Sequence, residues 1–357
     1  MVNGSSAPIG LIAMFPAIVA AVVLAVAFAS SPIKANTASP PTPPADGPEM
    51  LMVVGEQPGP GMWKVSKGNN VLWIVGSQAP VMQKMRWRAK GIRTVVAQSQ
   101  EVLSTPSVSV SARQIGYFTA LTMLPSALEA RKNPDNALLK DIIPADLYAR
   151  WLRLRDKYID EYNTDDESKD IERWRPIFAA LHLYSQAIKK SGMTNVSPVW
   201  PVVTDAAKKH RVKITTVKLE PAITNARAAL KDFRANRLAD LECFAKTIER
   251  IETDLDAMRA RANAWAVGDV DKLRRLPPSD QREACQMAMM NTTFAQTLGA
   301  QNIPVKMEMH WLATAEAALA KNAVTLAVLP IARLVAADGY LAQLRSKGFT
   351  IVEPEAD

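Results

Sequence analysis

The sequence predicts an α/β protein in which the N- and C-terminal parts of the chain form a small mixed β-sheet, flanked by helices, with a long helical region between them. Short apolar runs with strand character occur before residue 100 and after residue 320, each beside a helical pattern. Between about residues 124 and 298, in contrast, apolar residues recur mainly at helical spacing. With 357 residues, of which 48% are hydrophobic, the chain can bury a core without metal or several disulfides.

The first part of the chain predicts export. No charged side chain precedes Lys34, and residues 9–29 are almost entirely apolar. The segment closes with Ala27-Phe28-Ala29, a pattern typical of signal peptidase sites, but it is also long enough to span a bilayer. We therefore expect residues 1–29 to be a cleaved signal peptide or a retained membrane anchor. Either alternative makes the body periplasmic or otherwise exported, and a retained segment would attach it to the inner membrane through residues 9–29.

A Pro-rich linker is predicted at residues 30–61, where Pro41, Pro43, Pro44 and Pro48 favour an extended, polyproline-like chain. Residues 62–357 then form the folded domain.

The domain is predicted to begin with a hairpin. Residues 62–65 and 71–75 have strand character, and Gly68 with the two asparagines after it suits a tight turn between them. A helix at residues 84–91 and a third strand at residues 94–97 are expected to follow.

Helices dominate the predicted middle region. Apolar spacing predicts helices at residues 144–158, 170–190, 198–210 and 221–234, with one strand at residues 212–218. The clearest pattern covers residues 239–266, where apolar residues step by three and four. Such a stripe packs against one partner helix, and a seam inside the domain is favoured over a dimeric coiled coil because the repeat ends at Gly268.

The C-terminal part predicts a βαβ-like unit. A helix at residues 307–321 precedes a strand at 324–329, a turn at 330–334, a helix at 336–347 and a strand at 349–352.

Cys243 and Cys285 are the only cysteines of the chain. In an exported protein two thiols tend to be oxidised as a pair, so we expect a disulfide between them. The alternative is two free buried thiols.

The histidines limit the chemistry. His182, His210 and His310 are far apart in sequence, so no zinc-binding motif can be written, and we predict neither a metal nor a cofactor.

Two basic clusters are candidates for contacts with anionic partners. In an exported protein we expect them to be solvated surface, with anionic lipid headgroups or acidic glycans as the functional alternative, and we expect no nucleic acid. The first cluster surrounds Trp87 and consists of Lys84, Arg86, Arg88, Lys90 and Arg93. The second lies near residue 210 and consists of Lys208, Lys209, His210, Arg211 and Lys213.

Three segments carry a family resemblance. GMWKVSKGNNVLWIVGSQAP at residues 61–80, RTVVAQSQ at residues 93–100 and VTLAVLPIARLVAADGYLAQLRSKGFTIVEP at residues 324–354 resemble the TraB/GumN family, so that residues 62–357 are interpreted as one domain of that type. Some relatives are described as metal-dependent proteases that use two histidines and a glutamate. The resemblance places those positions at Ala79, Gln98 and Arg333. Ala79 has no ligand atom, Gln98 lacks the charge of glutamate, and Arg333 brings a cation that repels a metal ion.

The resemblance therefore implies a pseudoenzyme that binds an anionic ligand or partner at a vestigial site. The sequence leans against an enzyme but leaves open a periplasmic metal-dependent hydrolase or peptidase, and also an accessory role in exopolysaccharide biosynthesis or export. An anionic glycan, a lipid headgroup or a peptide is the expected partner. The candidate binding residues are Gly76, Ser77, Gln78, Ala79, Gln98, Glu220, Arg333 and Asp338.

Overall fold

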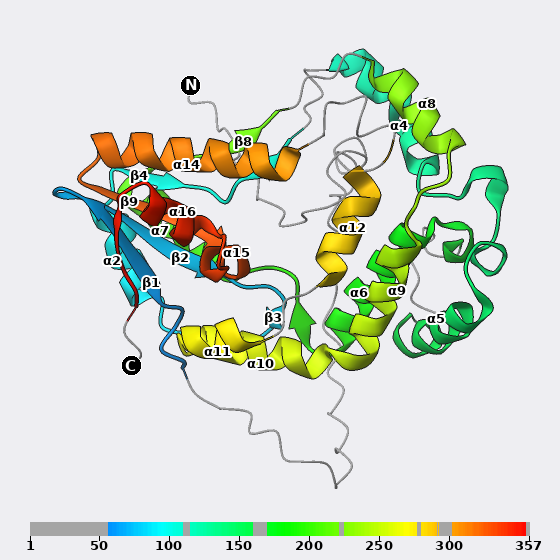
Figure 1. Cartoon of the computed structure of the whole chain (residues 1–357), viewed down its shortest axis with the longest axis horizontal. Coiled ribbons are helices and arrows are strands. Elements are labelled where there is room, and N and C mark those ends of the chain that lie inside the picture. The colour runs from blue at the N-terminus through cyan, green and yellow to red at the C-terminus, as the bar shows by residue number, and fades with distance from the viewer. Residues whose placement is uncertain are drawn as a thin grey trace, which may run out of the picture.

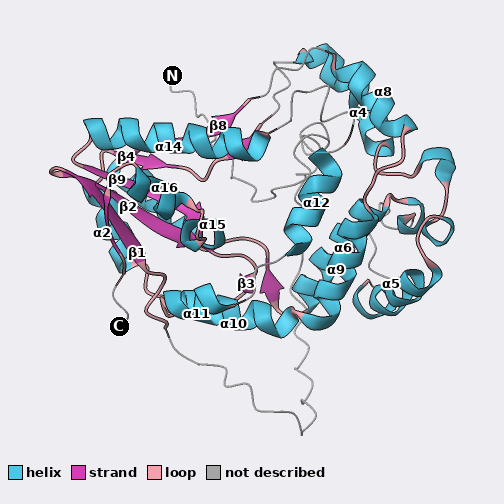
Figure 2. Ribbon diagram, viewed as in Figure 1, coloured by secondary structure: helices cyan, strands magenta, loops and turns pink. Residues whose placement is uncertain are grey.

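A computed structural model describes residues 56–109, 115–159, 170–220, 225–276, 280–290, 292 and 302–354. The predicted export segment and most of the predicted linker lie outside these residues. Strands gather on one side of the molecule and helices without strands occupy the other (Figures 1 and 2). This arrangement confirms the predicted α/β class with a mixed sheet flanked by helices.

The main sheet has six strands in the order β10-β1-β2-β9-β4-β7. Strand β1 is antiparallel to its neighbours β10 and β2, whereas β2, β9, β4 and β7 pair in parallel. Both ends of the chain build the sheet, as predicted, and the middle region adds one edge strand. The bounds are β1 (Met62–Lys67), β2 (Asn70–Ser77), β4 (Glu101–Leu103), β7 (Lys213–Thr215), β9 (Val324–Pro330) and β10 (Thr350–Val352).

Local sequence explains the central strands. β1 and β2 form the predicted hairpin, in which Gly68 adopts a positive φ of 64° that suits glycine. β9 is buried along almost its whole length, as expected of a central parallel strand. Since β10 runs parallel to β9, the connection between them is the predicted βαβ-like crossover.

The segment after the hairpin differs from the prediction. Residues 94–97 are not a strand but part of helix α2 (Lys90–Gln98), and of the predicted helix at residues 84–91 only residues 90 and 91 are helical. Ile92, Val95 and Val96 are buried at helical spacing, so their apolar run covers one helix face. The third strand is β4, in which only Val102 and Leu103 are buried apolar residues.

Seven helices of the described chain contact the sheet or lie beside it (Figure 1). They are α2, α7 (Val199–His210), α10 (Leu255–Ala266), α11 (Val270–Arg275), α14 (Ile303–Lys321), α15 (Ile331–Val335) and α16 (Tyr340–Ser346). Two short strand pairs extend this part of the molecule: β3 (Val81–Met82) with β6 (Met193–Thr194), and β5 (Ser107–Val108) with β8 (Lys218–Leu219).

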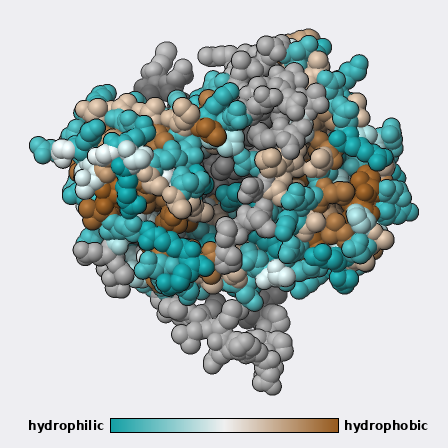
Figure 3. Space-filling model, viewed as in Figure 1, coloured by the Kyte–Doolittle hydropathy of each residue, from teal (hydrophilic) through white to brown (hydrophobic). Residues whose placement is uncertain are grey.

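The remaining helices form a separate packed group on the other side. They are α4 (Tyr117–Glu129), α5 (Ala145–Tyr158), α6 (Pro176–Lys190), α8 (Ala226–Ala235), α9 (Leu241–Thr253) and α12 (Asp280–Met290), with 3₁₀ turns at Pro134–Asn136, Leu139–Asp141 and Ile171–Arg173. Figure 3 shows a largely hydrophilic surface on this face, with smaller hydrophobic areas over both parts. None of the helices in the described ranges is long and apolar enough to cross a membrane.

The long helix predicted at residues 239–266 is two helices, α9 and α10, separated at Asp254. The apolar stripe serves two cores. Phe244, Ile248 and Ile251 pack in the helical group, whereas Trp265 packs in the core under the sheet. Helix α9 contacts both α6 and α12 rather than one partner. The apolar spacing is helical over the whole range, but the first helix ends at the point where the chain passes from the core of the helical group to the core under the sheet.

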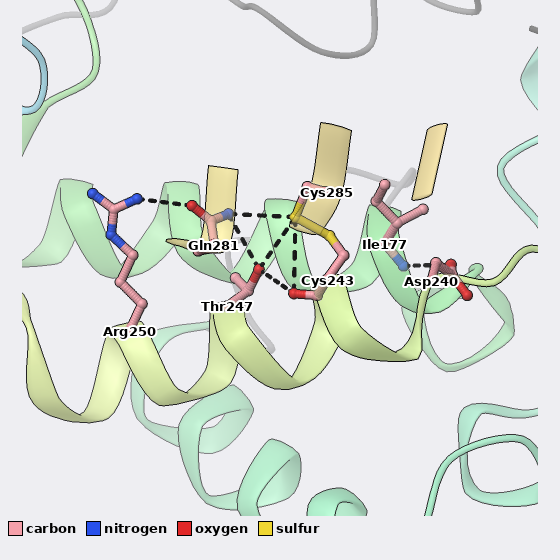
Figure 4. The surroundings of a disulfide bond; sticks show 7 residues. All are labelled: Ile177, Asp240, Cys243, Thr247, Arg250, Gln281 and Cys285. Carbon is pink, nitrogen blue, oxygen red and sulfur yellow. Dashed lines mark hydrogen bonds between the residues drawn. A yellow bond between two sulfur atoms is a disulfide. The ribbon is translucent and has the colours of Figure 1, made fainter. Parts of the chain in front are cut away.

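The predicted disulfide between Cys243 and Cys285 is confirmed, with a Cα–Cα distance of 4.4 Å (Figure 4). It joins α9 to α12 inside the apolar core of the helical group. Polar side chains surround it: Thr247 donates to the Cys243 carbonyl at 2.7 Å, and Gln281 Nε2 donates to Thr247 Oγ1 at 3.2 Å.

A buried charged pair organises the ends of four helices. Arg175, 1% exposed, donates to carbonyls at the C-terminal ends of α4 and α8, including Ala130 O at 3.0 Å and Phe233 O at 2.6 Å. Asp240, 2% exposed, accepts from the Ile177 N–H of α6 at 2.9 Å and directly precedes α9 (Figure 4). Burial lowers the pKa of Arg175 to about 10 and raises the pKa of Asp240 to about 6, so burial outweighs their mutual attraction.

Candidate functional site

The parallel pairing of β2 and β9 places two predicted site segments at the same edge of the sheet. Ser77 at the end of β2 is the register partner of Pro330 at the end of β9. The segment that contains Gln78 and Ala79 therefore begins beside the segment that leads to Arg333. This is the carboxyl edge of the sheet, where α/β proteins generally bind ligands.

The polar groups after β2 are bonded within the chain. The Trp265 indole N–H donates to the Gly76 carbonyl at 2.7 Å, and Ser77 Oγ donates to Leu329 O at 3.2 Å. The Gln78 amide donates to the Ala79 carbonyl at 3.2 Å. Ile331 lies so close to Gly76 that a Cβ there would come within 2.3 Å of its Cδ1. Buried apolar side chains and internal hydrogen bonds thus fill this part of the edge.

Arg333 makes an ion-pair network. Its Nη1 donates to Asp338 Oδ1 at 2.9 Å, and its Nη2 donates to both carboxylate oxygens of Glu308, at 3.0 and 3.2 Å. The Asp338 side chain is 81% exposed and that of Glu308 only 18%, so the Glu308 pair is the better shielded. Although partial burial of the guanidinium opposes the effect, the two carboxylates raise the pKa of Arg333 above its ordinary value.

Tyr340 lies near the charges of Glu308 and Arg333 and is 5% exposed. Its ring packs edge-on against Trp311 of α14, with centroids 4.8 Å apart. Burial and the nearby Glu308 carboxylate raise the pKa of its hydroxyl, so Tyr340 stays neutral. Glu308 was not predicted as a site residue. It lies in α14, 25 residues before Arg333, and no local sequence pattern indicates that the two side chains are in contact.

Gln98 lies at the opposite edge of the sheet. It ends α2, and two residues later Gln100 N donates to Val324 O at the start of β9. The seven residues of β9, about 20 Å of extended strand, separate that end from the Arg333 segment. Gln98 therefore lies about one strand length away from the Arg333 segment, and the eight predicted site residues do not all lie at the same edge of the sheet.

Ser104 and Thr105 occupy the carboxyl edge next to β9, where β4 ends. Thr105 Oγ1 donates to Val328 O at 3.0 Å, and Ser104 Oγ accepts from Val217 N at 2.8 Å. Neither residue was predicted as a site residue, because the apolar run at residues 94–97 predicted the strand in its place. The adjacent apolar residues Val102 and Leu103 were the sequence pattern that could have indicated a strand ending just before Ser104.

Glu220 forms an ion pair outside the Arg333 network. Its carboxylate pairs with Lys218 at 2.6 Å, whereas the two carboxylates that pair with Arg333 are those of Asp338 and Glu308.

The Trp87 ring, inside the first basic cluster, is not an open surface on which a ligand could stack. The indole lies half-buried and packs edge-on against Trp265, with centroids 5.7 Å apart. As for metals, no group of three or more His, Cys, Asp or Glu side chains converges among the residues that the structure describes.

The fold and the sheet edge define a class: an α/β protein whose mixed sheet is built from both ends of the chain and whose carboxyl edge carries an arginine held by two carboxylates. The model of the TraB/PrgY/gumN family matches residues 61–353, and the chain belongs to this family. No curated protein matches the chain, and no solved structure matches it.

Proposed function

We propose that this chain is an exported, catalytically inactive member of the TraB/PrgY/gumN family that acts by binding an anionic ligand or partner. One observation carries the first part of the proposal. At the carboxyl edge of the sheet, Arg333 occupies the position that the resemblance assigns to a histidine, and it holds Glu308 and Asp338 in ion pairs.

This arrangement is unsuited to the metal chemistry described for some relatives. Such chemistry needs neutral imidazoles and free carboxylates to hold a divalent ion and to activate water. Ala79 offers no ligand atom, and the Arg333 guanidinium cannot lose its charge and would repel a metal ion. The carboxylates nearest to it are already engaged.

Recognition of an anion is supported by the charge of the whole chain. With 43 Lys and Arg against 35 Asp and Glu, the formal net charge is +8. A net positive charge attracts acidic partners and accelerates their association. Arg333 itself is a poor candidate for this role, because an anion would have to displace Glu308 or Asp338 from it.

The inactive state can be tested on the exported form purified without a histidine tag. We expect no stoichiometric Zn, Mn or Co by mass spectrometry and no peptide cleavage with any of these metals added. Cleavage that a chelator stops, and that Asp338→Asn abolishes, would overturn the proposal. Glu220→Gln is the matched control, because Glu220 pairs with Lys218 rather than with Arg333.

A further inference from the structure

The helical group contains a cleft between α4 and α8 that no part of the proposed function uses. Its volume is about 720 Å³, within the range typical of small-molecule sites. The two helices lie side by side at the upper right of Figure 1. Met123 and Leu230 contribute apolar surface, and Thr122, Ser126 and Asn133 contribute hydroxyl and amide groups.

Three cations of α8 line this cleft. Arg227, Lys231 and Arg234 are spaced by four and three residues, so all three project from one face of the helix. From the first to the last they span about 10 Å along the helix axis. Ala229, Leu230 and Phe233 are buried and bind the helix to the core, which leaves the cationic face toward the cleft and solvent.

Among the described residues, none of these three side chains has a carboxylate partner. Arg227 donates to the neutral hydroxyl of Thr122 at 2.7 Å. Within the described residues, the side chains of Lys231 and Arg234 have no hydrogen bond or ion pair. Two acids line the cleft: Glu129 of α4, which pairs with Lys132 at 3.2 Å, and Asp135 of the turn Pro134–Asn136. The lining therefore has four cationic side chains, those of Lys132, Arg227, Lys231 and Arg234, against two acidic ones.

The position of this helix is set by buried contacts. Arg175 donates to the carbonyls of Phe233, Arg234 and Asn236, which close the C-terminal end of α8. Asn225 caps its N-terminal end by accepting from Ala228 N at 3.0 Å. The three cations are therefore presented from a helix that is held at both ends.

We infer that the cleft between α4 and α8 binds a ligand that carries two or more phosphate or carboxylate groups. Two guanidinium groups and one ammonium group supply charge-assisted hydrogen bonds to such oxyanions. Because the three cations are spread over about 10 Å along the helix axis, they can contact more than one oxyanion of the same ligand. The hydroxyl and amide side chains of the cleft can bond the remaining polar atoms. This inference rests on the proposed binding role, but it uses no residue of the sheet edge.

The test uses pyrophosphate and citrate as probes, titrated into the folded exported form by calorimetry at low ionic strength. We expect saturable binding that weakens as salt is added. Lys231→Ala with Arg234→Ala should weaken it at least tenfold. Lys231→Arg with Arg234→Lys, which keeps both charges, should retain most of it and guards against misfolding.

The matched control is Lys208→Ala with Lys209→Ala. It removes the same charge from the exposed last turn of α7, where these residues line no described part of the cleft. Binding that is absent, or that falls equally in the control, would overturn the inference. Chelator-sensitive hydrolysis would overturn the proposed inactivity instead, so the two failures are distinguishable.

A further comparison separates a free ligand from a lipid headgroup, since both can supply phosphate. Tyr117, Phe118 and Leu121 are 70%, 77% and 68% exposed on the first turns of α4, and could enter a membrane interface. Vesicles of phosphatidylglycerol are therefore compared with vesicles of phosphatidylcholine. If the anionic vesicles capture the protein and capture depends on Lys231 and Arg234, the phosphate belongs to a lipid headgroup. If pyrophosphate or citrate binds but the vesicles do not capture the protein, the ligand is a free molecule.

Discussion

The indole N–H of Trp265 donates to the carbonyl of Gly76 at 2.7 Å, across 189 residues of sequence. Trp265 is 1% exposed and lies in α10, whereas Gly76 lies near the end of β2. This bond ties the middle of the chain to the carboxyl edge of the sheet. It also satisfies a carbonyl that would otherwise point into an apolar core.

Trp265→Phe should therefore destabilise the protein by about 1–3 kcal/mol beyond the lost volume, because the Gly76 carbonyl would lose its buried partner. Trp311→Phe is the matched control, since the buried Trp311 indole N–H has no hydrogen-bond partner among the described residues. Denaturant unfolding of both variants compares the costs. Equal losses would contradict a stabilising role for the Trp265 bond.

The disulfide should contribute about 2–4 kcal/mol to the free energy of unfolding, because it closes a loop with a sequence separation of 42 residues. Cys243→Ala with Cys285→Ala, or reduction, should lower the melting temperature. Reduction should not change the double variant further, since the chain has no other cysteine. An unchanged melting temperature after reduction, verified by alkylation and mass analysis, would contradict this prediction.

Asp240 should make stability depend on pH. Burial raises its folded-state pKa from 3.8 to about 6, so the folded state binds a proton more tightly than the unfolded state. The contribution of protonated Asp240 to the free energy of unfolding is fully present below about pH 4. It decreases by about 3 kcal/mol as the pH rises from there through about 6.

The measurement is the difference in unfolding free energy between the wild type and Asp240→Asn across pH 3.5–7. Asparagine can still accept from the Ile177 N–H, and the advantage of the wild type should shrink as the pH rises. Asp232→Asn, an exposed position of α8, is the control. A difference that stays constant with pH would refute the assignment to Asp240.

The two partners of Arg333 should differ in weight. Glu308→Gln should cost about 1–2 kcal/mol, because it removes a shielded pair in which both oxygens accept from Nη2. Asp338→Asn should cost less than about 0.5 kcal/mol, because that carboxylate is largely solvated. Thermal unfolding at low and high salt measures both, and salt should affect the Asp338 contribution more. The reverse order of costs would show that Asp338 is the main partner.

Local sequence patterns predicted much of the fold. The hairpin of β1 and β2 follows from two apolar runs around Gly68, and the unit from β9 to β10 follows from its alternation of strand and helix patterns. These elements were predictable because neighbouring residues bury the same face. Cys243 and Cys285 could be paired because no other cysteine competes.

Errors arose where one apolar run fits two structures. Val95 and Val96 read as a strand but bury the face of a helix, because β4 supplies the sheet position instead. The stripe at residues 239–266 is helical throughout, yet α9 and α10 separate where the packing changes from the helical group to the sheet. Periodicity reports which face is apolar but not which element will cover it.

The sequence by itself determined the α/β class and the presence of Ala79 and Arg333 at the positions where the family resemblance places histidine. Only the tertiary structure decided that Glu308 and Asp338 hold Arg333, that Gln98 lies at the other edge, and that three cations of α8 face a cleft with α4. The physical reason is that ion pairs and clefts depend on contacts between distant segments, whereas periodicity and composition are properties of the local chain.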